Sequence, residues 1–434
     1  MLLNPTTICL AAALGCMLSL PVEAETFTPK SYIKAVFAVS PVIGSAEQSF
    51  EQAGSVYRSA IMDAVAPSFS LSLSNSLYDD QNTALRLRKG DTGSSLSASW
   101  NLYDSAASPV VKVRKARLDY EYAQLTLLIA KQSEAVSALN RFYALYSAKK
   151  RIEIARMNLA SRARQYKDTS EQYQSGTRSK TEQTQSEGDK LQSELSLAQA
   201  ESAARKALLA FNEMLNTEPD EEQEALVSTQ SVNIALPLPR DDMQKALDGN
   251  FSLRRQKVSL EKTRLNTRSN IMSDYPRFRL DASYNKSNLG LFRIPGGSWD
   301  GNPSYGLGMS LNFPFGFLGA QNYLDVKAQS NILKSAELGL VDALRSLKTS
   351  VLTAQEDIAL QVKSLKLLEF QIKAQKGTTD MLLEEYSQGN ARFLELDTAQ
   401  TKLLDSSGNQ ITAVNDMDIA LANYRTLLGE KIWE

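Results

Sequence analysis

The second half of the chain repeats the first, and this duplication limits the fold more than any other feature. The motif Tyr173-Gln-Ser-Gly176 returns as Tyr386-Ser-Gln-Gly389 at an offset of 213 positions, and the same offset relates Glu182 to Glu395. A segment that begins at Pro67 matches one that begins at Pro276. Solenoid repeats are only about 20–50 residues long. The sequence therefore predicts two large copies of one unit, at 25–218 and 246–434, joined by a linker region at 219–245.

The first 24 residues have the pattern of a leader. An apolar run at 8–20 is followed by Pro21 and by the small-residue motif Val22-Glu23-Ala24. This pattern predicts a secretory signal peptide, 1–24, and the apolar run is too short to span a membrane. The segment Ala13-Leu-Gly-Cys16 weakly resembles a lipoprotein cleavage site, so lipidation stays open as an alternative.

Composition excludes most catalytic chemistry. The chain has no histidine, and its two cysteines, Cys9 and Cys16, both lie in the predicted leader. Without these side chains there is no Ser-His-Asp or Cys-His site and no His- or Cys-ligated zinc. We predict neither an enzyme nor a cofactor. After residue 24 the basic and acidic residues balance, because only Glu23 of the 49 acidic residues lies in the leader, and 48 basic residues oppose the rest. This balance does not favour nucleic-acid binding.

Two long stretches without proline predict helical hairpins. No proline occurs from 110 to 218 or from 315 to the end, and each stretch is broken once, near Gly176 and near Gly389. We expect antiparallel helical hairpins at 108–217 and 318–429. The second carries a coiled-coil type of apolar seam, which includes Leu340, Leu344, Leu347, Val351, Ala354, Ile358, Val362 and Leu365.

Ahead of each hairpin, apolar and small polar residues alternate. The alternation predicts four strands, at about 68–78, 94–103, 277–287 and 304–313. A soluble antiparallel sandwich has the same pattern, but the leader and the long helices favour a transmembrane β-barrel. Four strands cannot close a barrel in lipid, so several chains must share one. Three chains would give twelve strands and leave room for a pore.

The chain also resembles a known family, the TolC-type outer-membrane efflux proteins, over essentially its whole length after residue 24. The matching segments are Ser31–Ala35, 56–67, Asn250–Leu253 with Tyr275-Pro276, Leu311–Phe315 with Gly319, the two Tyr-x-x-Gly turns and 420–429.

This resemblance implies a mixed α and β membrane protein. A homotrimer would form a 12-stranded β-barrel in the outer membrane of a Gram-negative cell, with four strands from each chain, among outer-membrane lipid. A long α-helical barrel with an internal two-fold repeat would continue it through the periplasm. The duct would dock with a periplasmic adaptor protein and an inner-membrane transporter, and would pass small molecules or proteins without chemistry. The alternative is a non-transporting periplasmic coiled-coil protein of the envelope.

The resemblance also assigns candidate site residues. The aperture would be formed by Glu182 and Glu395, with Tyr386 and its counterpart Tyr173 as closing residues. Five residues would form the helix-turn tips where the adaptor docks: Gly176, Thr177, Arg178, Gly389 and Asn390.

Two positions depart from the family pattern. The second aperture acid falls at Thr398, next to Asp397, and the closing arginine falls at Ala391. Arg392 or Arg178 are the candidate replacements for that arginine. An alternative for Glu182 and Glu395 is that both are ordinary solvated helix residues.

Overall fold

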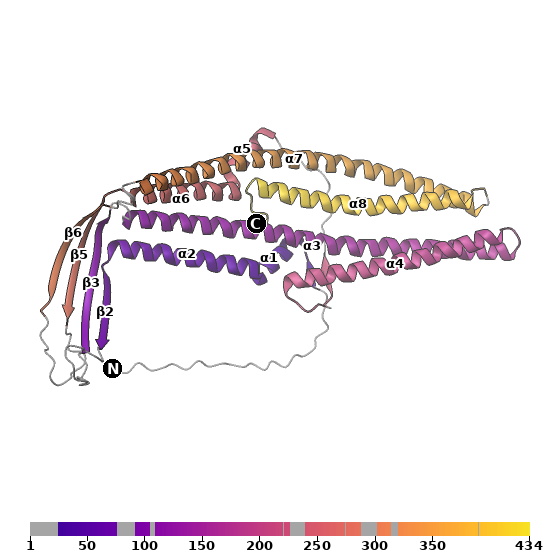
Figure 1. The fold of residues 1–434 in the computed structure, drawn as a ribbon. Helices are drawn as coiled ribbons and strands as arrows, with labels where there is room; N and C mark the ends of the chain where they lie inside the picture. The colour runs from indigo at the N-terminus through magenta and orange to yellow at the C-terminus, as the bar shows by residue number, and fades with distance from the viewer. Residues whose placement is uncertain are drawn as a thin grey trace. The chain divides into compact units, whose positions relative to one another are not determined.

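The computed structural model describes residues 25–75, 92–104, 109–219, 221–225, 239–273, 275–287, 302–313, 320–388 and 390–434. The predicted leader, Gly389 and a large part of the predicted linker lie outside the described residues. The first copy contains β1 (Glu25–Phe27), α1 (Pro29–Val39), α2 (Pro41–Val65), β2 (Ser68–Asn75), β3 (Thr92–Asp104), α3 (Pro109–Gln174) and α4 (Lys180–Leu215) (Figure 1). The second contains β4 (Gln223–Ala225), α5 (Pro239–Gly249), α6 (Phe251–Ser273), β5 (Arg277–Ser287), β6 (Ser304–Asn312), α7 (Ala320–Ser387) and α8 (Phe393–Leu427).

The two copies have the same element order, and the likeness extends to the ends of their helices. The Ser40 hydroxyl accepts a hydrogen bond from the backbone N–H of Ile43 at the start of α2. At the equivalent start of α6, Asn250 Oδ1 accepts from the N–H of Leu253 at 2.9 Å. Both residues are good N-caps because a short side-chain oxygen can reach a free backbone donor. Just beyond α4 and α8 stand Asn216 and Gly429, with φ of 53° and 79°.

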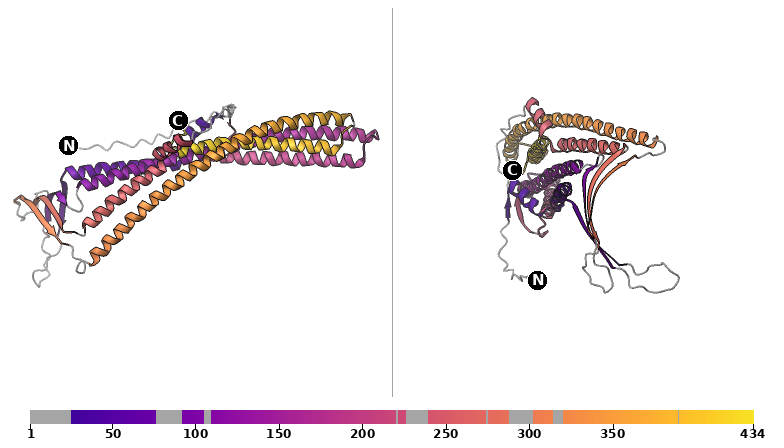
Figure 2. Two further views of the ribbon diagram at one scale, coloured as in Figure 1. Left: turned by 90° about the horizontal axis from the view of Figure 1, so that it is seen from above. Right: turned by 90° about the vertical axis from the view of Figure 1, so that its left-hand side faces the viewer.

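Four strands form one antiparallel sheet in the order β2-β3-β5-β6 (Figure 1 and Figure 2). The hairpin of the first copy, β2–β3, thus lies beside the hairpin of the second, β5–β6. The join between copies is the β3–β5 pair, in which Ala98 faces Tyr284 and the register shifts between Asn101 and Tyr103. Within the described residues β2 pairs only with β3, and β6 pairs only with β5. The backbone groups on the outer sides of β2 and β6 therefore form two open edges.

The two faces of this sheet differ in chemistry. On one face the apolar side chains are exposed: Phe69 and Leu71 in β2, and Tyr305, Leu307 and Met309 in β6, the last three each more than 70% exposed. The opposite face is polar. There, hydroxyl groups of β2 and β3 join in three cross-strand pairs with oxygen separations of 2.6–2.8 Å, which are Ser68–Ser99, Ser70–Ser97 and Ser72–Ser95. An exposed apolar face of this size requires a partner that is itself apolar.

The chain divides into two compact units, and each unit contains segments from both copies. The first unit comprises, among the described residues, 25–36, 138–219, 221–225, 378–388 and 390–411. Its aromatic core contains Tyr32, which stacks on Phe211 at 4.0 Å between ring centroids, with Phe27 and Phe142 beside them. The Tyr32 hydroxyl donates to the carbonyl oxygen of Phe211 at 3.0 Å, and burial raises the pKa of this tyrosine.

The second unit comprises 37–137, 232–377 and 412–434. The seam predicted on the second hairpin supplies its core: Val351 and Ile358 are fully buried, and Met417 of α8 packs in the same cluster. Tyr424 of α8 donates a hydrogen bond to Asp242 Oδ2 at 2.7 Å and accepts one from Gln355. Burial is the main cause that raises the pKa of Tyr424 to about 12.

Two glycines allow a close backbone contact in the second unit, and their substitution tests it. A Cβ on Gly249 would collide with the Leu428 carbonyl, and a Cβ on Gly429 would collide with the backbone of Gly249. We predict that Gly249→Ala lowers stability by roughly 1–3 kcal/mol, because the two backbones must move apart. The control is Gly377→Ala in α7, where a Cβ meets nothing within 4 Å. That change should stabilise the helix by up to about 1 kcal/mol. Thermal unfolding in detergent measures both, and equal melting temperatures would contradict the assigned contact.

Candidate functional site at the paired helix turns

The turns between α3 and α4 and between α7 and α8 have the same hydrogen-bonding pattern. After α3, the backbone N–H groups of Thr177 and Arg178 both donate to the Gln172 carbonyl, at 2.9 and 3.3 Å. After α7, those of Asn390 and Ala391 both donate to the Glu385 carbonyl, at 2.9 and 3.3 Å. The last carbonyls of a helix are otherwise without partners, and this reversal satisfies them. The duplicated sequence therefore folds into duplicated turns.

Gly176 occupies the position in the first turn that needs glycine. Its φ is +80°, a left-handed backbone in which a side chain is strained. Thr177 adds a side-chain bond, since its hydroxyl donates to the Gln172 carbonyl at 2.8 Å. The predicted counterpart Gly389 lies outside the described residues.

Arg178 contacts the second copy at this site. Its guanidinium carbon lies 4.7 Å from the centre of the Tyr386 ring, and its Nη1 is 3.3 Å from Glu182 Oε1. The arginine side chain is only 15% exposed, so both contacts are partly shielded from water. A cation over an aromatic face contributes on the order of 1 kcal/mol. Of Arg178 and Arg392, the structure places Arg178 over the ring of Tyr386, the tyrosine that the resemblance suggests as a closing residue.

The two tyrosines that the sequence treats as equivalent differ in environment. Tyr386 is 5% exposed, packs with Phe393 and Leu396, and its hydroxyl lies 3.4 Å from Thr169 Oγ1. Tyr173 is 36% exposed, with the Lys180 ammonium 5.7 Å from its ring. Only Tyr386 is built into a buried contact between the copies.

The two predicted aperture acids also differ. Glu182 belongs to a capping box at the start of α4: it accepts from the backbone N–H of Ser179 at 3.2 Å, while the Ser179 hydroxyl accepts from the N–H of Glu182. This bond stabilises the helix end, so Glu182 has a structural role whatever else it does. Glu395 lies in the first turn of α8 and is exposed, and among the described residues its carboxylate has no side-chain partner.

Close to the turns lies an ionic cluster around a buried arginine, which sequence reasoning did not find. Arg162 of α3 has a side chain only 6% exposed, and its Nη2 lies 2.6 Å from Asp397 Oδ1 of α8. Its Nη1 lies 3.9 Å from Asp189 Oδ2 of α4. The sequence singled out Asp397 only because it is adjacent to Thr398, the position of the family's second aperture acid. Nothing along the chain marked Arg162, because its repeat equivalent is the uncharged Gln375.

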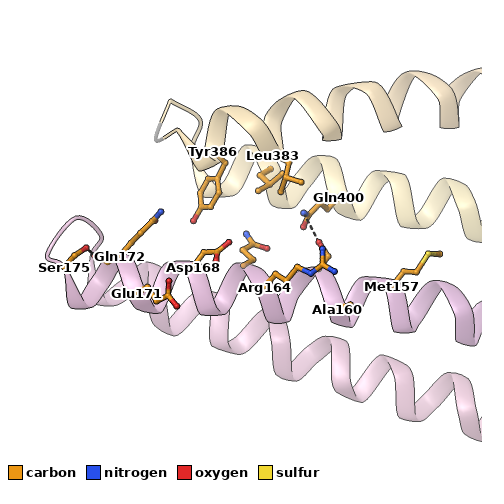
Figure 3. A pocket seen from close by; sticks show the side chains of 13 residues that line it. Met157, Ala160, Arg164, Asp168, Glu171, Gln172, Ser175, Leu383, Tyr386 and Gln400 are labelled. Atoms are coloured by element: carbon orange, nitrogen blue, oxygen red, sulfur yellow. Dashed lines mark hydrogen bonds between the residues drawn. The ribbon is translucent and has the colours of Figure 1, made fainter.

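A cleft of about 720 Å³ adjoins the turns, within the first unit. Figure 3 shows Arg164, Asp168 and Gln172 of α3 on one side, and Tyr386 and Gln400 on the other. The Gln400 amide donates to Ser161 Oγ at 3.4 Å across it. Its volume is typical of sites that bind a small molecule or part of a partner. Charged and amide groups line α3, whereas Leu383 and Leu396 lie opposite.

Metal-binding clusters and membrane-spanning helices are both absent from the part of the chain that the structure describes. No group of three or more His, Cys, Asp or Glu side chains is placed to hold a metal ion. None of the helices in the described ranges has a stretch that is both long and apolar enough to cross a bilayer.

The comparisons identify related proteins. Residues 243–430 match the family model described as outer membrane efflux protein. No curated protein sequence matches the chain. Among solved structures, the transmembrane channel protein CusC aligns with a TM-score of 0.76 at 14% identity, over 92% of this chain and 92% of CusC. The outer membrane protein VceC from Vibrio cholerae gives 0.75 at 13% identity, over 94% and 97%. The MtrE outer membrane channel of Neisseria gonorrhoeae, solved in its open state, gives 0.72 at 14% identity, over 93% and 89%.

At such low identities the structural likeness concerns the fold, while the family model concerns the sequence of the second copy. The two findings agree with each other and with the motifs quoted from the sequence. The resemblance is confirmed: residues 243–430 match the outer membrane efflux protein family by sequence, and more than nine-tenths of the chain shares its fold with solved outer-membrane channel proteins.

Proposed function

We propose that this chain is the outer-membrane exit duct of an export system that spans the cell envelope. It is a passive channel that extends from the outer membrane into the periplasm. The observation that carries this proposal is a four-stranded sheet with one apolar face, one polar face and two open edges. Both the family match and the solved structures concern outer-membrane channels rather than enzymes.

The open edges support a shared barrel. Unpaired backbone N–H and C=O groups cannot remain in hydrocarbon, where each lost hydrogen bond costs several kcal/mol. The free edge of β6 in one chain would therefore pair with the free edge of β2 in the next. Three chains would supply twelve strands, enough to enclose a pore. The exposed face with Leu307 and Met309 would then contact lipid, and the serine pairs would face the water-filled interior.

The exposed surface of α7 also supports contacts between chains. The described part of α7 buries Leu347, Val351 and Ile358 within the second unit, yet it keeps a second row of leucines exposed. That row is Leu338, Leu352, Leu360 and Leu367, each more than half exposed. Its steps of 14, 8 and 7 residues are close to whole heptads, so the four side chains lie along one face of the helix, as in a coiled-coil seam. A neighbouring chain of the trimer would cover this row of leucines and so close the helices into a periplasmic barrel.

The paired turns are the proposed docking and gating end of the duct. The tips Gly176, Thr177, Arg178, Gly389 and Asn390 would meet a periplasmic adaptor, and an inner-membrane transporter would supply the energy. Tyr386, with Arg178 above it, would hold the closed aperture, and Tyr173 would face outward. Glu395 is the stronger candidate for the aperture charge, since Glu182 is already engaged by Arg178 and Ser179.

A lipid-facing substitution tests the barrel. We predict that Leu307→Arg strongly reduces assembly in the outer membrane, because a cation on the lipid face near the midplane costs roughly 2–4 kcal/mol. The control is Asn285→Arg on the polar face of β5, which should assemble nearly as well as the native chain. Fractionation followed by electrophoresis of unheated samples measures the trimer. Recovery of the native chain as a periplasmic monomer would instead favour the coiled-coil envelope protein.

Neutralising the aperture acids tests the gate. We predict that Glu395→Gln lowers the preference for K⁺ over Cl⁻ in planar bilayers, because three carboxylates near the axis attract cations. Glu182→Gln should have a smaller effect, since Arg178 already offsets that charge. Glutamine keeps the capping bond, so the change removes charge and leaves the helix start intact.

The control for this test is Glu213→Gln, an exposed acid near the other end of α4. It should leave ion preference unchanged. If Glu395→Gln behaves like this control, the aperture assignment is wrong even where the channel itself conducts.

A further inference from the structure

The cluster of Arg162, Asp189 and Asp397 joins three helices and both copies of the repeat, and its arginine is buried while the two aspartate side chains are 30% and 26% exposed. Arg162 comes from α3 and Asp189 from α4, both in the first copy, whereas Asp397 comes from α8 in the second. All three residues lie within the first compact unit. One guanidinium serves two carboxylates, so the cluster carries a net charge of −1 when both aspartates are ionised. Breaking a buried ion pair from one side leaves an uncompensated charge, which is strongly unfavourable.

The two aspartates do not share the arginine equally. Asp397 has the short contact of 2.6 Å, and Asp189 is left at 3.9 Å, beyond hydrogen-bond distance. The Arg162 Nη1 donor is directed to Gln165 Oε1 at 3.3 Å instead. Asp189 Oδ2 is consequently buried without any hydrogen-bond partner.

The electrostatic surroundings of Asp189 favour its protonated form. Burial and then the negative charge of Asp397 raise the pKa of Asp189, and Arg162 only partly opposes them. The adjacent cation on its own helix does not help, because Lys190 contacts Glu194 at 3.4 Å and lies 5.7 Å from the Tyr166 ring of α3. Asp189 therefore binds a proton more tightly inside the cluster than it would in water.

We propose that Arg162, Asp189 and Asp397 form a proton-sensitive clasp, which holds α3, α4 and α8 together beside the turns and releases a proton when these helices separate. The inference rests on the proposed function, which places the gate of the duct at this end, and it adds that these helices separate when the gate opens. A neighbouring contact belongs to the same joint, since Gln400 of α8 donates to Ser161 of α3. That contact is uncharged, so the pH response resides in the three ionic residues.

The direction of the response follows from proton linkage. Below the ordinary pKa of an aspartate, Asp189 is protonated in both the joined and the separated states, and pH has no effect. Between that value and the raised pKa of the joined state, separation releases a proton and is favoured as pH rises. Above the raised value both states are ionised and the effect is complete. Acidification therefore favours the joined, closed state.

Distances between spin labels test this without any transport assay. Residues 25–434 contain no native cysteine. Labels can therefore be attached to cysteines introduced at Leu195 of α4 and Leu394 of α8, which are 51% and 65% exposed. In the full-length trimer we expect the ratio of separated to joined populations to rise with pH, by at most about tenfold per pH unit in each chain. Asp189→Asn should remove this dependence and keep the helices joined at every pH.

Arg162→Gln should act in the opposite direction. The two neighbouring carboxylates, which are only partly shielded from water, then repel each other, so the separated population should rise at neutral pH and fall on acidification. If this variant does not assemble, Arg162→Lys provides the second test, because it keeps the charge and should retain the pH dependence. The matched control is Asp405→Asn, an exposed aspartate of α8, which should behave like the native chain.

The proposal is overturned if label distances in the native chain do not change with pH, or if the change survives Asp189→Asn. Bilayer currents recorded on the same variants separate the clasp from the duct. Distances that respond as expected in a protein that conducts no ions would support the clasp and contradict the proposed function.

Discussion

Backbone hydrogen bonding at the edges of the β2-β3-β5-β6 sheet is the constraint on which the proposed assembly depends. Each edge strand leaves one side of its backbone without partners, and the adjoining face is apolar enough to require lipid or protein. Those two demands cannot both be met by one chain in a membrane. In the proposed assembly, additional chains would meet both at once, and they would also cover the second apolar row of α7. The need to pair the edge strands would thus also bring the exposed leucines of α7 against a neighbouring chain.

Duplication provided two equal turns, and their side chains then diverged. Arg178 has no charged counterpart, because its repeat equivalent is Ala391. It lies over the ring of Tyr386 in the other copy, which is buried, whereas Tyr173 is exposed. In the same way Glu182 is tied to its helix end and Glu395 is not. The backbone of the two turns is therefore symmetric. The side chains of the candidate gate are not, because the arginine at 178 has an alanine as its equivalent at 391.

Much of the fold follows from short-range sequence signals. Alternation marked the strands, and β5 occupies the predicted 277–287, while β3 extends slightly beyond its prediction, at 92–104. Absence of proline marked the long helices, and the seam through Val351 and Ile358 is buried. These properties depend on neighbours within a few residues, which is why pattern alone finds them. The compact units were less predictable, since each is assembled from both copies.

The candidate site depends on contacts between distant segments, so the sequence revealed it only in part. The turn residues were found because their motif is repeated. Arg162 could not be found in this way, since an arginine in a polar helix has no local signal of burial. Its two partners lie 27 and 235 positions away in the sequence. The contact between Arg178 and Tyr386 is likewise visible only in the structure. Charge placement between helices is a three-dimensional property that periodicity does not encode.

The serine pairs between β2 and β3 have a consequence for whatever passes beside them. In each pair either hydroxyl can be the donor, so the hydrogen atoms can rearrange at little cost. Such a surface resembles water in its hydrogen bonding, because each hydroxyl can donate or accept and no single arrangement is fixed. A solute in contact with it exchanges one set of weak bonds for another of similar strength. Along this stretch transit would be nearly frictionless, and discrimination among solutes would have to occur elsewhere.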